Sequence, residues 1–169
     1  MTLTRVLAFD DDQVQAGAFA RAVGAPLAVV ERHRFPVGEL RLRLPGALGG
    51  TVAFWRGLHQ PNEKLLELMI AAPAARELGA RQMMLVCPYL AYMRQDTAFT
   101  PGEAVSQRHV GRLLAQHFEA VTTVDPHLHR VRSLDAVLPG IRCMVVSAAG
   151  LLGAWAAAQE PDALLIGPD

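Results

Sequence analysis

Short apolar runs that alternate with segments of helical periodicity constrain the fold of this chain more than any other feature. The runs that indicate strands lie at residues 3–9, 51–55, 82–87, 121–124 and 141–146. Strands that are apolar on both faces are typical of parallel sheets with helices on both sides. The order of elements therefore predicts an α/β fold, with a mostly parallel sheet flanked by helices.

Helix and turn signals define the remaining predicted elements. The first helix ends at Gly24, and Pro61 starts a longer helix at its first turn, a position that tolerates proline. Asp10, Asp11 and Asp12 precede the first helix, where carboxylates are predicted to cap its free amides. The other predicted helices span residues 103–118 and 148–159, and the other predicted strands span residues 26–35, 39–44 and 163–166.

Composition limits the classes of function. The chain has 169 residues, 51% of them hydrophobic, so it can bury a substantial core. The 16 basic residues balance 16 acidic ones, and no basic field indicates a nucleic-acid partner. No apolar stretch reaches the roughly 20 residues that a membrane helix requires, and the N-terminus lacks the pattern of a signal peptide. We therefore expect a cytoplasmic protein without a nucleic-acid or membrane partner, in which Cys87 and Cys143 are core thiols.

One polar cluster follows the apolar run at residues 82–87. Arg94 offers a planar cation for phosphate or for stacking on adenine, and the Gln95 amide can read a base or ribose edge. Asp96 is placed to orient Arg94 or a metal-bound water. Ligands of open parallel sheets bind outside the carboxyl ends of strands, which favours a functional role. The alternative is a solvated loop in which an Arg–Asp pair closes a turn.

A second polar cluster follows the apolar run at residues 121–124. Asp125, His127 and His129 alternate, so they share one face of an extended segment and could hold a cation there. Mg²⁺ prefers oxygen ligands, whereas imidazole suits Zn²⁺ or Mn²⁺, so the pattern alone leans towards a transition metal. The alternative is that the histidines cap the turn after the strand.

Four segments, in the expected order, resemble the ribose-phosphate diphosphokinases, also called phosphoribosyl pyrophosphate synthetases. They are Phe35-Pro36-Val37-Gly38-Glu39, Pro61-Asn62-Glu63-Lys64-Leu65-Leu66-Glu67-Leu68, Pro88-Tyr89-Leu90-Ala91-Tyr92-Met93-Arg94-Gln95-Asp96 and Asp125-Pro126-His127. Residues 99–103 resemble the archaeal-type branch of this family. The resemblance implies the N-terminal half of such an enzyme. Residues 1–145 would then form its phosphoribosyltransferase-like (type I) domain, and residues 146–169 a linker helix and the first strand of a second domain.

The resemblance implies roles for the ATP-binding residues. In the family, the counterparts of Arg94 and Gln95 contact ATP, and we assign Asp96 to the same site. The counterparts of Phe35 and Glu39 hold the adenine of a neighbouring subunit's ATP. A homo-oligomer, a dimer or a hexamer, is therefore expected.

The resemblance also implies a metal and a reaction. His127 corresponds to the residue beside the Mg²⁺ that carries ATP, with Asp125 supporting it, and the role of His129 stays open. The implied reaction transfers diphosphate from ATP to ribose 5-phosphate and forms phosphoribosyl pyrophosphate. Catalytic residues in this half are unknown. The chain contains neither the loop that binds the ribose phosphate nor the basic loop over the transferring phosphates, so alone it is predicted to be inactive.

Several positions depart from the family pattern. Val37 replaces an aspartate that could accept a hydrogen bond from adenine, and Thr97 and Ala98 replace basic residues near the triphosphate. At residues 47–49, Ala-Leu-Gly stands where phosphate-regulated members have Ser-x-Arg, so phosphate activation is predicted to be absent. Val37, Thr97 and Ala98 favour an alternative, a non-catalytic nucleotide-binding or regulatory paralogue. An NAD-binding domain is excluded because no Gly-x-Gly-x-x-Gly follows the first strand.

Overall fold

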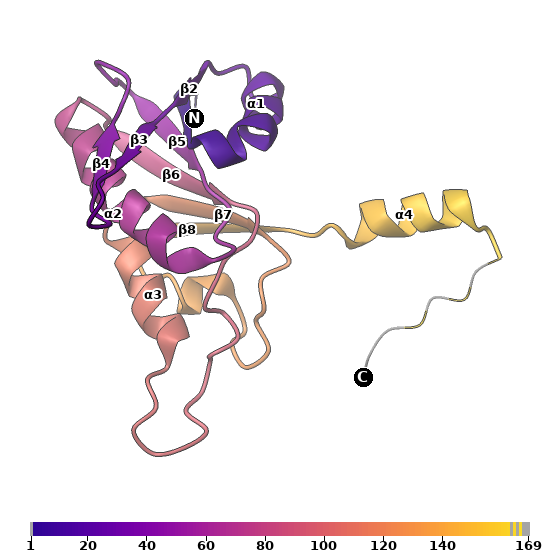
Figure 1. Ribbon diagram of the computed structural model, residues 1–169. Coiled ribbons are helices and arrows are strands. Elements are labelled where there is room, and N and C mark those ends of the chain that lie inside the picture. The colour runs from indigo at the N-terminus through magenta and orange to yellow at the C-terminus, as the bar shows by residue number, and fades with distance from the viewer. Residues whose placement is uncertain (1, 163, 165, 167–169) are drawn as a thin grey trace.

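A six-stranded sheet forms the centre of the computed structural model, which describes residues 2–162, 164 and 166 (Figure 1). The strand order is β2-β1-β5-β6-β7-β8, and every neighbouring pair is parallel. The strands are β1 (Leu3–Ala8), β2 (Leu27–Val29), β5 (Thr51–Trp55), β6 (Gln82–Cys87), β7 (Ala120–Val124) and β8 (Arg142–Val146). The predicted parallel α/β architecture is confirmed.

Helices cover both faces of this sheet. Helix α1 (Gln13–Ala22) joins β1 to β2, whereas α2 (Pro61–Glu77) joins β5 to β6 and α3 (Ser106–Ala115) joins β6 to β7. The α1 connection runs towards one edge of the sheet and the other two run towards the opposite edge. Because crossovers between parallel strands are right-handed, α1 lies on one face and the other two helices lie on the other.

Alternate residues of each strand pack on opposite faces of the sheet. The larger core lies under α2 and α3, where Leu7, Phe54, Leu85 and Val121 are aligned in register across four strands. The ring of Phe118 meets that of Phe54 edge-on, with centroids 5.7 Å apart. A smaller cluster lies under α1 and contains Val6, Ala20, Ala25, Ala53 and Val86.

The predicted strand at residues 26–35 is two strands in two different sheets. Strand β2 joins the main sheet, whereas β3 (Glu31–Arg34) pairs antiparallel with β4 (Leu40–Arg43) as a separate hairpin. Val30, between β2 and β3, is buried and its N–H donates to the Ala8 carbonyl at 2.8 Å. Nothing in the apolar pattern marks this change of sheet, because the chain remains extended throughout.

Two further boundaries differ from the prediction. Helix α3 begins at Ser106, and Glu103 instead closes the preceding loop by accepting hydrogen bonds from the Phe99 N–H and the Thr100 hydroxyl, at 2.7 and 2.6 Å. The predicted final strand falls partly on residues 163 and 165, which lie outside the described residues.

The C-terminal helix α4 (Ala149–Gln159) projects away from the sheet (Figure 1). None of its residues is buried. Within the described residues, no helix has the length and apolar character needed to cross a membrane.

Candidate functional site

The two predicted polar clusters lie at neighbouring strand ends. Strands β6 and β7 pair through Cys87 and Thr123 near their carboxyl ends. The loop with Arg94 leaves β6, and the loop with His127 leaves β7. The Val124 N–H donates to the Pro88 carbonyl at 3.4 Å, so the two loops begin side by side. The strand order therefore brings both clusters to one edge of the sheet.

Arg94 is exposed on a loop whose neighbouring residues are buried. Met93 and Asp96 lie inside, and the half-buried Gln95 donates from Nε2 to the Thr97 carbonyl at 3.1 Å. Within the described residues, the Arg94 side chain makes no hydrogen bond or ion pair. Its guanidinium therefore keeps all of its donors for a ligand.

Asp96 anchors this loop to the loop that follows β7. Its side chain is fully buried, and Oδ1 accepts a hydrogen bond from Arg130 Nη1 at 2.8 Å. Oδ2 is buried without a partner among the described residues. The alternative in which Arg94 and Asp96 close a turn together is wrong, because the carboxylate pairs with Arg130.

Tyr92 joins two of the segments that carry the family resemblance. Its φ of 65° places the backbone in the left-handed region, and its hydroxyl donates to Asn62 Oδ1 at the start of α2. Left-handed backbone is uncommon for residues other than glycine and costs energy that surrounding contacts must offset. The contact with Asn62 is one such contact, so it fixes where the loop turns.

Asp125 does not share a face with the two histidines in the predicted way. Its φ of 38° interrupts the extended backbone, and its Oδ2 accepts a hydrogen bond from the Ala148 N–H at 2.8 Å. The imidazoles of His127 and His129 do come together, stacked with centroids 5.8 Å apart. The carboxylate is therefore directed towards the start of α4, because the left-handed residue rotates it out of the alternating pattern.

These residues fit a metal ion that retains most of its water. No group of three or more His, Cys, Asp or Glu side chains is arranged to hold a metal in the described part of the chain. One carboxylate oxygen of Asp125 has no partner there, and His127 is exposed. Such a small donor set suits Mg²⁺, which keeps several waters, better than a transition-metal site built from protein ligands.

Phe35 and Glu39 lie at the turn between β3 and β4. The Phe35 N–H donates to the Glu39 carbonyl, and the Gly38 N–H donates to the Phe35 carbonyl, both at 2.8 Å. Gly38 has a φ of 96°, which a side chain would oppose. Phe35 is 38% exposed, and its ring meets that of His33 edge-on, so it is not a core aromatic. No hydrogen bond or ion pair within the described residues joins this turn to Arg94.

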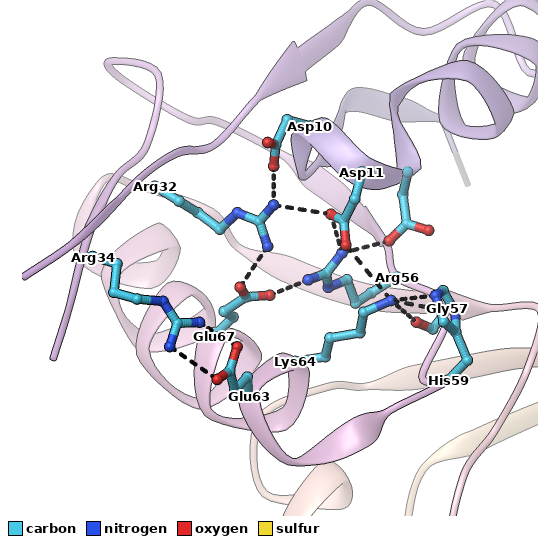
Figure 2. A network of polar contacts seen from close by, with 11 residues as sticks. Asp10, Asp11, Arg32, Arg34, Arg56, Gly57, His59, Glu63, Lys64 and Glu67 are labelled. Atoms are coloured by element: carbon cyan, nitrogen blue, oxygen red, sulfur yellow. Dashed lines mark hydrogen bonds and ion pairs between the residues drawn. The ribbon is translucent and has the colours of Figure 1, made fainter. Parts of the chain in front are cut away.

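A buried arginine forms the centre of a charge network that the sequence did not predict (Figure 2). Arg56 directly follows β5 and its side chain is fully buried. Its Nη1 donates to Asp11 and Asp12 at 2.5 and 2.7 Å, and its Nη2 donates to Glu67. The guanidinium also lies over the Phe9 ring, 4.4 Å from its centre.

The network fixes the β3–β4 hairpin to the rest of the domain. Arg32 on β3 donates to Asp10, and it binds Glu67 on α2 at 2.7 Å (Figure 2). Arg34, also on β3, pairs with Glu63 on α2. These contacts join the hairpin to α2 and to the short 3₁₀ helix at Asp10–Asp12.

The predicted helix-capping role of Asp10, Asp11 and Asp12 is wrong. Neither the 3₁₀ helix nor α1 has a side-chain cap, because the carboxylates are bound by arginines. Burial raises the pKa of Asp11, but the hydrogen bond from Arg56 and the nearby cations outweigh it and lower that pKa. A charged residue directly after a buried strand is the one signal in the sequence that could have indicated the network.

The network occupies a position where this type of sheet usually binds ligands. Strands β1 and β5 are neighbours, but their helices leave towards opposite faces, which makes their carboxyl ends a topological switch point. The pocket there measures about 440 Å³ and is lined by Arg56, Lys64 and Glu67, among others. Lys64 donates to the Gly57 carbonyl at 3.1 Å. The protein's own ion pairs thus use most of the donors that would face a ligand.

Comparison with known families identifies the chain. A family model described as the N-terminal domain of ribose phosphate pyrophosphokinase matches residues 4–117. The chain belongs to this family. A solved structure, phosphoribosylpyrophosphate synthetase from Mycobacterium smegmatis, superimposes with a TM-score of 0.80 and 21% identity, over 95% of this chain and 53% of that chain. This likeness confirms the fold.

Curated members of the ribose-phosphate pyrophosphokinase family are similar along nearly the whole chain. The protein of that name from Methanopyrus kandleri is 39% identical over 97% of this chain and 56% of its own length. The one from Halobacterium salinarum is 34% identical over 97% of this chain and 57% of its own length. The chain spans about half the length of the curated relatives it matches. These relatives are mostly archaeal, which confirms the predicted branch.

Proposed function

We propose that the protein to which this chain belongs is a ribose-phosphate diphosphokinase. It transfers diphosphate from ATP to the C1 hydroxyl of ribose 5-phosphate and forms phosphoribosyl pyrophosphate. The observation that carries the proposal is the guanidinium of Arg94, which is exposed, without a partner among the described residues, and held at the carboxyl end of β6. Family membership supports the same reaction.

Arg94 and Gln95 bind ATP in this proposal. Arg94 donates to oxygens of the transferring phosphates, because its planar donors match phosphate geometry. Gln95 uses its Nε2 on the Thr97 carbonyl, which leaves its side-chain oxygen free to accept from a ribose hydroxyl or an adenine amine. Asp96 does not contact ATP directly in this proposal but supports the loop from its buried side, where it pairs with Arg130.

Asp125 and His127 would hold the Mg²⁺ that enters with ATP. The ion supplies neutralising charge to the triphosphate when bound. Asp125 would offer its remaining carboxylate oxygen, and the exposed His127, two residues further along the same loop after β7, would offer an imidazole.

The contribution of this chain to catalysis is positioning and electrostatic stabilisation. The C1 hydroxyl oxygen attacks the β-phosphorus of ATP and its proton passes to water, the bond from that phosphorus to the α-phosphate oxygen breaks, and AMP leaves. The donors of Arg94 face the charge that develops on the transferring phosphates, and fixed donors of this kind lower the barrier. No described residue is assigned as the base.

Phe35 and Glu39 act on a neighbouring subunit in this proposal. They lie on an exposed turn of the hairpin that makes no hydrogen bond or ion pair with Arg94 within the described residues, so in this proposal a second copy brings them to the nucleotide. Val37 at the same turn is 82% exposed and has no polar group to offer adenine. The assembly is accordingly a homo-oligomer, and adenine is held mainly by stacking on Phe35.

A regulatory paralogue that binds nucleotide without turnover is the second candidate. Thr97 and Ala98 follow Arg94 closely and add no positive charge where basic residues would bind phosphate. An electrostatic site with fewer cations stabilises the transferring diphosphate less.

Release of AMP that depends on ribose 5-phosphate, measured on the full-length protein, tests the proposal. We expect turnover in the full-length protein without substitutions. In Arg94→Ala we expect kcat/KM to fall about 10- to 100-fold, because a lost charge-assisted hydrogen bond costs about this factor. Arg108→Ala is the matched control, since Arg108 is an exposed cation on α3. Binding of Mg-ATP without any AMP release would favour the regulatory paralogue.

A further inference from the structure

One buried residue fixes the backbone on both sides of Arg94. Gln107 lies in the first turn of α3 and is 1% exposed. Its Nε2 donates to the Met93 carbonyl at 3.0 Å, and its backbone N–H donates to the Gln95 carbonyl at 3.2 Å. The carbonyl groups of both sequence neighbours of Arg94 are therefore held by the same residue.

A second contact holds the segment from the other side. Arg130 donates to the buried Asp96 at 2.8 Å and lies over the Phe99 ring, 5.8 Å from its centre. Arg130 belongs to the loop after β7, one residue beyond His129. The pair thus joins the loop that carries Arg94 to the loop that carries His127.

Both contacts bury polar groups, which costs free energy of hydration. A buried amide or carboxylate loses hydration, and that loss is recovered only through its partners. An apolar residue at position 107 would pack α3 without this cost. The side chains of Gln107 and Asp96 instead direct their polar atoms at the backbone and loop around Arg94, whose own side chain is left unbound within the described residues.

We propose that Gln107 and the Asp96–Arg130 pair are positioning residues that hold Arg94 in a fixed place relative to His127. A binding group on a rigid base loses less conformational freedom when it takes up its ligand. The identity of that ligand, the phosphates of ATP, rests on the proposed function. The rigidity of the segment does not depend on it and is measured separately.

Trypsin cleavage of the native chain after Arg94 measures this rigidity. Cleavage requires local opening, and its rate follows the population of the open segment. Gln107→Met keeps the size of the side chain and removes its donor, so we expect cleavage after Arg94 to be about 5- to 10-fold faster. Cleavage after Arg56, whose side chain is fully buried, reports global unfolding and should change by less than about twofold by the same reasoning.

A separate set of variants tests the contact between Arg130 and Asp96. Arg130→Gln leaves the buried Asp96 carboxylate without a cation, and we expect about tenfold faster cleavage after Arg94. Arg130→Lys should restore most of the protection, because it keeps the charge. Arg132→Gln removes a cation from the same loop at an exposed position and should leave the rate unchanged.

A double-mutant cycle with Mg-ATP completes the test. Gln107→Met should weaken Mg-ATP binding several-fold in the parent but not further in Arg94→Ala, because the residue acts through Arg94. Equal weakening in both backgrounds would overturn the positioning role, as would unchanged cleavage after Arg94 or a parallel rise after Arg56. If the parent binds no Mg-ATP but cleavage after Arg94 rises alone, the positioning role stands and the proposed function fails for this chain.

Discussion

Replacement of Arg56 by methionine tests the charge network most severely. The guanidinium is fully buried, and it binds Asp11, Asp12 and Glu67. Methionine fills a similar volume but leaves three carboxylates around an apolar group. Among the residues that the structure describes, only Arg32 and Lys64 then remain within ion-pair distance of any of them.

The expected cost at pH 7 is large. Removal of one partner from a buried ion pair typically destabilises a protein by about 3–5 kcal/mol, because the remaining charge stays desolvated. For a chain of this length, each kcal/mol lowers the melting temperature by about 2–4 °C, so we expect a decrease on the order of 10 °C. Arg41→Met is the matched control. Arg41 is exposed on β4, makes no ion pair in the described ranges, and should change stability by less than about 0.5 kcal/mol.

The difference in unfolding free energy between the parent and Arg56→Met should become smaller at low pH. Burial opposes ionisation of Asp11, but the Arg56 hydrogen bond outweighs it, so the folded pKa lies below the unfolded value. The stabilisation is therefore present in full above the unfolded pKa, near 3.8, and is lost as the pH falls through the lowered folded value. In the variant the carboxylates can protonate, so the gap between parent and variant should narrow below about pH 4.

Urea unfolding of parent, Arg56→Met and Arg41→Met at pH 7, 4 and 3 provides the measurement. A loss below about 1 kcal/mol at pH 7 would contradict the account of Arg56 as the main cation of a buried network. A gap that stays equally large at pH 3 would contradict the ionic origin of the effect.

Three further predictions concern packing, reactivity and assembly. Gly111→Ala should destabilise the protein by about 1–3 kcal/mol in urea unfolding despite the better helix propensity of alanine, because a Cβ there would lie 2.1 Å from the Val137 carbonyl oxygen. Gly17→Ala, whose Cβ would meet nothing nearer than 3.5 Å, should be neutral or stabilising by up to about 1 kcal/mol. Burial raises the pKa of Cys87 to about 12, so mass spectrometry should find it unmodified by iodoacetamide at pH 8 until denaturant is added. Light scattering should report a dimer or larger, and Phe35→Asp should shift it towards monomer; a monodisperse monomer in both proteins would remove the support for a shared site.

Most of the sheet was predictable because its strands are continuous apolar runs. Five such runs gave β1, β5, β6, β7 and β8 with small boundary errors, and the run predicted β8 although most of that strand is exposed. The change of sheet at Val30 was not predictable. No glycine or proline marks it, and pairing between β3 and β4 depends on register rather than local preference.

The candidate site was predictable only where the order of strands in the sheet determines which loops are neighbours. Arg94 and His127 follow adjacent strands, so strand order alone brings their loops together. The partners that hold them are distant in sequence. Arg130 lies 34 residues from Asp96, and no periodicity relates the two. The aspartates before α1 show the same limit. The local sequence predicts that they cap the helix, but Arg56, 44 residues from Asp12, binds the carboxylates instead.

Binding of Mg-ATP to this chain and to its Arg94→Ala variant, measured by isothermal titration calorimetry, tests the central claim most directly. We expect the exposed guanidinium of Arg94 to donate hydrogen bonds to the phosphates of ATP, so the Arg94→Ala variant should bind Mg-ATP about 10- to 100-fold more weakly. Arg108→Ala, which removes an exposed cation from α3, should bind as the parent does. Equal affinity in parent and Arg94→Ala, or no binding of Mg-ATP by the parent, would contradict the assignment of this edge of the sheet as the nucleotide site.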